Sequence, residues 1–210
     1  MVVIERFDSD AVLIDFRHDL RSGWRNRAVH AALSHSIHVL REASLDPGNA
    51  EGETRPLDYR VVPGPLAKSI VPDLYELYAS AAMLELVANE FGHARIETCP
   101  DEISGFNINV LVGRDSYYKW HIDLAPYTLV FFVTTAEQTE GGTFRFKRAD
   151  GTITDVAAAE GHGIVINGSR LPHCVTPLLR DLCRVTVAAE YVVSGESLLG
   201  THEALGNYVF

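Results

Sequence analysis

The feature that most constrains the fold is a series of short segments, beginning near Ile103, in which apolar and polar residues alternate. The clearest segment is 106–112, FNINVLV, and others follow at 128–134, 142–147, 152–156, 163–166 and 184–193. A period of two places successive side chains on opposite faces of a strand. Turn residues such as Gly141-Gly142 and Asn167-Gly168 separate the segments. Many short strands joined by such turns predict an antiparallel barrel or jelly roll.

The first hundred residues follow a different pattern. We predict strands at 2–5 and 11–16, and helices at 24–43, 65–79 and 80–91, from the spacing of the apolar residues. An exposed loop is expected from Pro47 to Arg55, Ser80 can cap the last helix, and Gly92 can end it. We therefore predict one integrated domain, in which residues 1–102 form a supporting region of helices and strands and residues 103–210 form the β-rich core.

Composition excludes several classes of protein. The 210 residues carry 18 Lys and Arg against 28 Asp and Glu, a net charge of −10, which disfavours a nucleic-acid partner. The longest apolar stretch, 124–136, is too short to cross a bilayer, and acidic residues near the N-terminus argue against a signal peptide. Three cysteines without CxxC spacing predict reduced thiols and a cytoplasmic location. No membrane partner is expected, and the sequence does not specify an oligomeric state.

The triplet His121-Ile122-Asp123 is the first candidate for chemistry. In an extended segment, residues i and i+2 share a face, so the imidazole and the carboxylate lie side by side. His173 follows in a turn that leads into a strand. Two histidines and one carboxylate form the facial triad that holds non-haem Fe(II) and leaves other coordination positions open.

Arg184 is the second candidate, because it interrupts an apolar strand, Cys183-Arg184-Val185-Thr186-Val187. A buried guanidinium needs a partner, and arginine suits a bidentate carboxylate. An anionic ligand is the natural partner, and Thr186 lies on the same face and can donate a further hydrogen bond. The alternative is a structural salt bridge to Glu190 or to a helix.

His121, Asp123, His173 and Arg184, in this order on short strands, resemble the Fe(II)/2-oxoglutarate-dependent oxygenase superfamily, and more specifically its prolyl-hydroxylase-like branch. The resemblance runs from about 106 to 192 and includes Gly113 and Tyr118, the strand at 127–132 and the segment 140–144. It implies an α+β protein built on a double-stranded β-helix, a cupin-like jelly roll, with the catalytic core at 103–210.

The resemblance also implies roles. His121, Asp123 and His173 would ligate Fe(II), and Arg184 with Thr186 would hold the distal carboxylate of 2-oxoglutarate. Tyr118 keeps its family position, but Leu111 and Phe131-Phe132 stand where the family pattern has tyrosines. Thr128 and Asn109 are therefore further candidates for contacting the co-substrate. Asn107, Trp120 and Arg145 are candidates for contacting the substrate, although Arg145 can also lie on the outer face.

The implied reaction is hydroxylation of a small-molecule metabolite, of the amino-acid or natural-product type, using O2 and 2-oxoglutarate and releasing succinate and CO2. Ascorbate is expected to stimulate it. A carboxylate at 123 favours hydroxylation, while desaturation and cyclisation stay open. The alternatives are a peptide or protein hydroxylase of the same superfamily, a cupin-like metal protein that is not an oxygenase, and a binding module in which the histidines are incidental.

Overall fold

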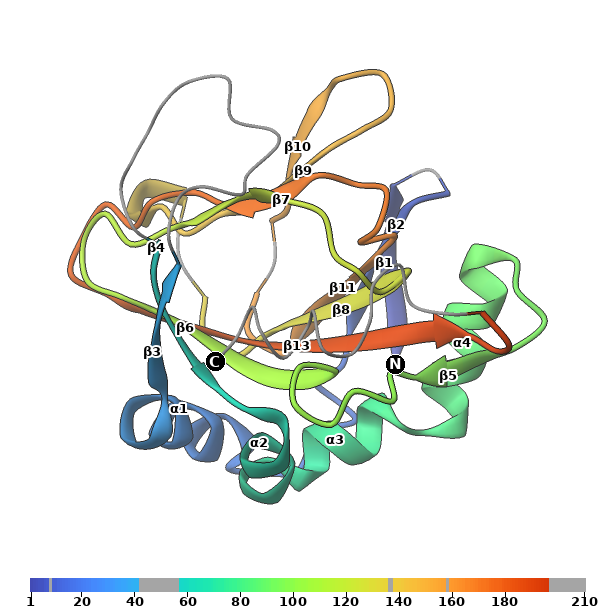
Figure 1. Ribbon diagram of the computed structural model, residues 1–210, viewed down its shortest axis with the longest axis horizontal. Coiled ribbons are helices and arrows are strands. Elements are labelled where there is room, and N and C mark those ends of the chain that lie inside the picture. Colours follow the sequence, from blue (N-terminus) through green and yellow to red (C-terminus); the bar gives the residue numbers. More distant parts are fainter. Residues whose placement is uncertain (8, 42–56, 136–137, 158, 197–210) are drawn as a thin grey trace.

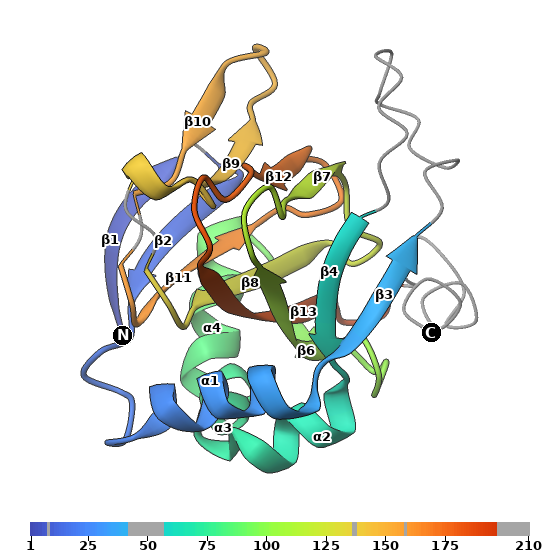
Figure 2. The same cartoon turned by 90° about the vertical axis from the view of Figure 1, so that its left-hand side faces the viewer.

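The computed structural model covers residues 1–210 and describes residues 1–7, 9–41, 57–135, 138–157 and 159–196. These residues form three layers (Figures 1 and 2). A small sheet faces a large sheet, and helices cover the other face of the large sheet. All the strand pairs are antiparallel. This arrangement confirms the predicted α+β jelly roll.

The large sheet has nine strands. Eight follow the order β1-β2-β11-β8-β13-β6-β4-β3, and β5 pairs with β13. Their bounds are β1 Val2–Phe7, β2 Ala11–Asp15, β3 Ile37–Arg41, β4 Leu57–Val62, β5 Ile96–Thr98, β6 Phe106–Val112, β8 Tyr127–Phe132, β11 His162–Ile166 and β13 Cys183–Val193. Residues before 103 therefore supply five of the nine strands, so the two parts of the chain build one sheet together.

The small sheet has four strands in the order β10-β9-β12-β7. They are β7 Tyr118–His121, β9 Phe144–Lys147, β10 Ile153–Asp155 and β12 His173–Val175, and a short 3₁₀ turn spans Gln138–Glu140. The inner face of this sheet packs on the inner face of the large sheet through an apolar cluster that includes Phe144 and Phe146 from one sheet and Phe132 and Leu111 from the other.

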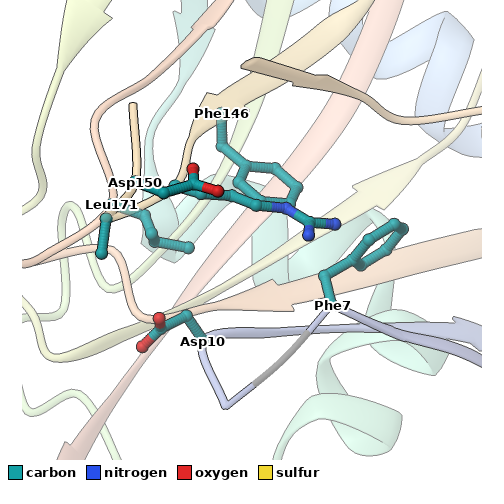
Figure 3. Close-up of a pocket in the computed structure, with 7 residues that line it drawn as sticks. Phe7, Asp10, Phe146, Asp150 and Leu171 are labelled. Carbon is teal, nitrogen blue, oxygen red and sulfur yellow. The ribbon is translucent and has the colours of Figure 1, made fainter. Parts of the chain in front are cut away.

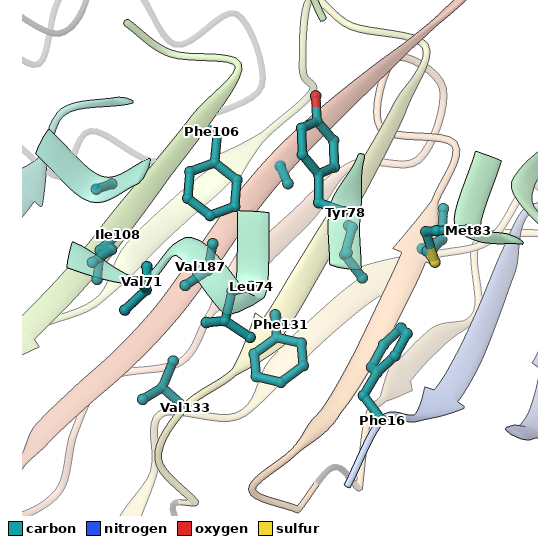
Figure 4. Packing of buried hydrophobic residues seen from close by; sticks show 14 of the residues in the cluster. Phe16, Val71, Leu74, Tyr78, Met83, Phe106, Ile108, Phe131, Val133 and Val187 are labelled. Atoms are coloured by element: carbon teal, nitrogen blue, oxygen red, sulfur yellow. The ribbon is translucent and has the colours of Figure 1, made fainter. Parts of the chain in front are cut away.

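A second apolar cluster lies between the large sheet and the helices (Figure 4). Strand β13 shows how the two clusters are kept apart. Val185, Val187 and Ala189 point into the helix-side cluster, together with Tyr78 and Phe106. The residues between them on β13 therefore point to the inner face, because side chains alternate along a strand. Arg184, Thr186, Ala188 and Glu190 consequently share that inner face.

The helices are α1 Trp24–His35, α2 Gly64–Ile70, α3 Pro72–Tyr78 and α4 Ala81–Phe91. The predicted ends of the last helix are confirmed: the Ser80 hydroxyl accepts a hydrogen bond from the Met83 amide at 3.2 Å, and Gly92 ends the helix with φ at 73°. The helix predicted at 65–79 is instead two helices. Val71 leaves the helical conformation and Pro72 starts the next helix, where its missing N–H costs nothing.

The helix predicted at 24–43 was wrong beyond His35. Ser36 is extended, with ψ at 139°, and Ile37–Arg41 pairs with β4, a strand that the sequence analysis did not predict. The buried face of α1 is also different, since alanines at 28, 31 and 32 are buried while Leu33 is 58% exposed. The loop predicted from Pro47 to Arg55 lies outside the described residues. Among the described residues, no helix combines the length and the apolar character needed to cross a membrane.

Candidate metal centre

His121, Asp123 and His173 converge between the two sheets. One ligand atom from each side chain lies within 4.8 Å of those of the other two. Asp123 stands between the histidines: its Oδ1 is 3.6 Å from Nε2 of His121, and its Oδ2 is 3.5 Å from Nε2 of His173. Three donor atoms at these separations can share one metal ion.

Strand pairing brings these residues together. His121 ends β7, and His173 begins β12 directly opposite it, so the two rings are 4.1 Å apart between centroids. Asp123 lies in the loop that follows β7. Its backbone amide donates a hydrogen bond to the Gly168 carbonyl at 2.8 Å, which fixes the position of this loop. A Cβ at position 168 would lie 2.4 Å from Oδ2 of Asp123, so this close approach requires glycine.

The neighbouring hydrogen bonds orient the three side chains as a metal site needs. Nδ1 of His121 donates to the Lys119 carbonyl at 2.7 Å, and Nδ1 of His173 donates to the Leu171 carbonyl at 2.9 Å. Because Nδ1 faces a carbonyl in both rings, Nε2 is the atom of each ring that can bind a metal once it carries no proton. The Thr128 hydroxyl donates to Oδ2 of Asp123 at 2.6 Å. Two neutral imidazoles and one carboxylate fit non-haem Fe(II).

The electrostatics of the cluster favour a cation. Burial acts to raise the pKa of Asp123, but His173 and His121, with hydrogen bonds from His173 and Thr128, hold that pKa well below its usual range. Burial acts to lower the pKa of His173, yet the Asp123 carboxylate and the Leu171 carbonyl raise it above its ordinary value. The carboxylate thus stays ionised and attracts positive charge to this position.

Arg184 is buried on the inner face, with only 5% of its surface exposed. Its Nη2 atom is buried and has no hydrogen-bond partner among the described residues. Burial lowers the pKa of Arg184 to about 10, so the side chain remains a cation at neutral pH. The alternative salt bridge is not found: within the described ranges, no carboxylate makes an ion pair with it, and Glu190 lies six residues further along β13.

Aromatic rings connect Arg184 to the metal cluster. The guanidinium lies over the Phe132 ring at 5.8 Å, Phe132 contacts Phe144 at 6.3 Å, and Phe144 contacts His173 at 5.6 Å. Leu111 is buried opposite Arg184 on β6. Of the residues predicted to stand at tyrosine positions, Leu111 and Phe132 therefore give Arg184 apolar neighbours on the inner face, whereas Phe131 packs in the helix-side cluster.

The structure places most of the other candidates on this inner face. Thr186 is buried between Phe132 on β8 and Asn109 on β6. Asn107 and Asn109 are half-buried and alternate with helix-facing residues of β6. The Asn107 amide donates to the Ser104 carbonyl at 2.7 Å.

Two candidates lie on β7 itself. The ring of Tyr118 lies edge-on to that of His121, with centroids 4.4 Å apart, and Trp120 is half-buried beside His121. Thr128, a candidate for the co-substrate, is engaged with Asp123 and therefore orients a ligand of the metal cluster.

Arg145 does not join the metal cluster. Phe144 and Phe146 point inward from β9, so Arg145 between them points outward, where it forms an ion pair with Asp155 at 2.8 Å. There it lines a cavity of about 490 Å³ together with Thr143, Thr176 and others.

A cavity of about 250 Å³ lies between the end of β1, strand β9 with the turn after it, and the segment before β12 (Figure 3). Its lining is Phe7, Asp10, Phe146, Arg148, Ala149, Asp150 and Leu171, without any member of the metal cluster. It touches the cluster only through Leu171, whose carbonyl holds His173, and through Phe146, which pairs with His173 across the sheet. We therefore assign the chemistry to the metal cluster on the basis of its donor atoms.

Sequence reasoning missed Glu190 as a site residue. It lies opposite Thr128 on the inner face, and its Oε2 atom is buried without a hydrogen-bond partner in the described part of the chain. Burial, with a smaller contribution from Asp123, raises the pKa of Glu190 to about 8. The signal was available, because residues 184, 186 and 190 share a period of two, but only the coordinates reveal that the carboxyl group contacts Cys99 and leaves Oε2 without a partner.

Comparison with known proteins gives results at the level of structure. No family model and no curated protein matches the sequence. A 2OG-Fe(II) oxygenase family protein from Burkholderia pseudomallei matches with a TM-score of 0.66 and 15% identity, covering 92% of this chain and 90% of that one.

Two further structures illustrate the range of this fold. A prolyl hydroxylase from Trichoplax adhaerens, in complex with a hypoxia inducible factor peptide fragment, matches with a TM-score of 0.62 and 11% identity over 94% and 87% of the two chains. HygX from Streptomyces hygroscopicus, with nickel, 2-oxoglutarate and hygromycin B bound, matches with a TM-score of 0.60 and 14% identity over 91% and 86%. The chain described here therefore has the fold of the 2OG-Fe(II) oxygenases.

Proposed function

We propose that this protein is an Fe(II)- and 2-oxoglutarate-dependent oxygenase that hydroxylates a small-molecule metabolite and releases succinate and CO2. The observation that carries the proposal is Arg184, a buried cation with an unpartnered Nη2 on the inner face of the large sheet, which faces the small sheet that carries both histidines of the cluster. A buried guanidinium without a partner is costly, and a dicarboxylate that also reaches the metal cluster would provide one. A cupin-like metal protein of another kind would not need this arrangement.

Each residue of the site has a separate role in this proposal. His121, Asp123 and His173 would hold Fe(II), and Thr128 keeps Asp123 oriented. Arg184, with Thr186, would bind the distal carboxylate of 2-oxoglutarate, while the rings of Phe132 and Phe144 exclude water between the two ends. When bound, Fe(II) supplies the oxygen chemistry. The overall reaction balances: substrate, O2 and 2-oxoglutarate give hydroxylated substrate, succinate and CO2.

A small-molecule substrate is the preferred class. HygX, a protein of the same fold, was solved with hygromycin B, which supports a small molecule, whereas the Trichoplax enzyme was solved with a peptide fragment. The half-buried position of His121 is compatible with a compact substrate. Incubation with metabolite and peptide panels, read by succinate release and by a mass gain of one oxygen atom in the product, decides between the two classes.

The first experiment measures binding of 2-oxoglutarate to the Ni(II)-loaded protein by calorimetry. The Arg184→Ala variant should bind it about 30- to 1,000-fold more weakly, which corresponds to the loss of about 2–4 kcal/mol for a truncated charge pair. Arg6→Ala is the matched control, since Arg6 pairs with Glu90 on the exposed surface and its loss should leave binding unchanged. Equal affinity in wild type and Arg184→Ala would contradict the proposal.

A further inference from the structure

Three buried polar atoms on β13, on β6 and just before β6 have no hydrogen-bond partner among the described residues. They are Oε2 of Glu190, Oδ1 of Asn107 and Oγ of Ser104, each buried and without a hydrogen bond among the described residues. The pairing of β13 with β6 brings these positions together: Asn107 lies opposite Ala188, and the Glu190 amide donates to the carbonyl of Gly105 at 2.9 Å. Buried polar groups are normally paired, so this group calls for a ligand.

The position of this group separates it from the co-substrate end of the inner face. Glu190 pairs with Thr128, whose hydroxyl holds Asp123, so Glu190 lies level with the metal cluster. Arg184 and Thr186 lie nearer the start of β13 and are buried, whereas Ala188, Glu190 and Asn107 are half-buried. The inner face is therefore closed at the Arg184 end and more open at the Glu190 end, where a substrate can approach.

The chemistry of the three atoms specifies what they can bind. Because the Asn107 amide nitrogen already donates to the Ser104 carbonyl, its Oδ1 can only accept. A carboxylate oxygen also accepts, and a serine hydroxyl can accept. A primary ammonium group offers three N–H donors and a positive charge, and so matches three acceptors of which one is an acid.

We propose that Glu190, Asn107 and Ser104 form a subsite for a primary ammonium group of the substrate. This inference rests on the proposed oxygenase function and narrows its substrate class to amine-bearing small molecules. Arg184 would then hold the dicarboxylate near the start of β13, and Glu190, which gives up its proton when an ammonium group binds, would hold the amine further along the strand.

The test measures binding of matched probes to the Ni(II)- and 2-oxoglutarate-loaded protein by ligand-observed NMR. The probes are L-lysine, L-ornithine, 1,5-diaminopentane and glucosamine, each compared with its fully N-acetylated derivative. The wild type should bind at least one amine about tenfold or more tightly than the acetylated form. In Glu190→Gln, which keeps the shape but cannot become a carboxylate, this preference should fall to near one while the affinity for 2-oxoglutarate stays unchanged.

The outcomes separate the two proposals. If no amine is preferred, or if the preference survives in Glu190→Gln, the subsite is wrong even when 2-oxoglutarate binds normally. If 2-oxoglutarate fails to bind the wild type, the proposed function fails, and the amine preference is then read on the Ni(II)-loaded protein alone. Asn107→Ala should also reduce the preference and provides the same test if Glu190→Gln does not fold.

Discussion

The Arg184 guanidinium lies inside the protein with one nitrogen that has no hydrogen-bond partner among the described residues. An unpaired buried charge destabilises the folded state, so a function-neutral core would replace it with an apolar side chain. Arg184→Met should therefore raise the free energy of unfolding of the ligand-free protein by about 1–3 kcal/mol. The same variant should no longer gain stability from 2-oxoglutarate. Urea unfolding with and without 2-oxoglutarate checks both, and a less stable Arg184→Met protein would contradict the first.

Glu190 predicts a dependence of stability on pH. Its pKa is raised from 4.5 to about 8, so the folded protein retains a proton there that the unfolded chain releases near pH 4.5. This contribution is complete below pH 4.5 and is lost as the pH rises towards 8. With the metal chelated, the free energy of unfolding of the wild type relative to Glu190→Gln should fall by about 2–4 kcal/mol between pH 5 and pH 8. Parallel curves for the two proteins would show that Glu190 is not held protonated.

At the scale of single residues, the candidate metal ligands could be predicted from the sequence better than the contacts around them. The order of His121, Asp123, His173 and Arg184, together with the resemblance that it carries, predicted the cluster, because ligand chemistry depends on residue type. Whether Glu190 is paired and whether Gly168 touches Asp123 depend on strands and loops that are remote in sequence. Those facts required the coordinates.

At the scale of elements, Tyr78 joins helix α3 to the large sheet. Its hydroxyl donates to the Glu190 carbonyl at 2.6 Å and accepts from the Cys99 amide at 3.0 Å. Tyr78→Phe removes this partner from both backbone groups, although the Cys99 amide still donates to the Glu190 carbonyl at 2.9 Å, and should lower the free energy of unfolding by about 0.5–1.5 kcal/mol. Tyr75→Phe is the control, because the Tyr75 ring packs on the same Phe106 and its loss of a hydroxyl should change stability by less than about 0.5 kcal/mol. Chemical denaturation of both variants makes the comparison.

Elements were predictable where local signals agreed. Helix α4 combines a serine cap, a regular apolar face and a terminal glycine, and its predicted ends were confirmed. The segment after His35 was mispredicted because Ile37 and Leu40 continue the helical spacing of α1. Pairing with β4 and the extended Ser36 decide its conformation instead. A partner strand that is distant in sequence can override local spacing.

At the scale of the whole molecule, the metal cluster joins β7 and β12 of the small sheet to the loop after β7, whose Asp123 amide donates to the Gly168 carbonyl. A metal that binds only the folded state should stabilise it, by about 2.7 kcal/mol at 100 times the dissociation constant. Adding Ni(II) should therefore raise the thermal midpoint, and a chelator should reverse the change. His173→Ala should show no such response, and an equal response in that variant would place the metal elsewhere.

Gly168 offers no donor atom, yet its backbone carbonyl fixes the Asp123 loop and its missing side chain leaves room for the carboxylate. Consider a saturation mutagenesis library selected once for expression and once for retention of nickel. The difference between the variants that pass the two selections should be largest at a position like 168. Substitutions there should pass the first selection and fail the second, as though residue 168 were itself a ligand.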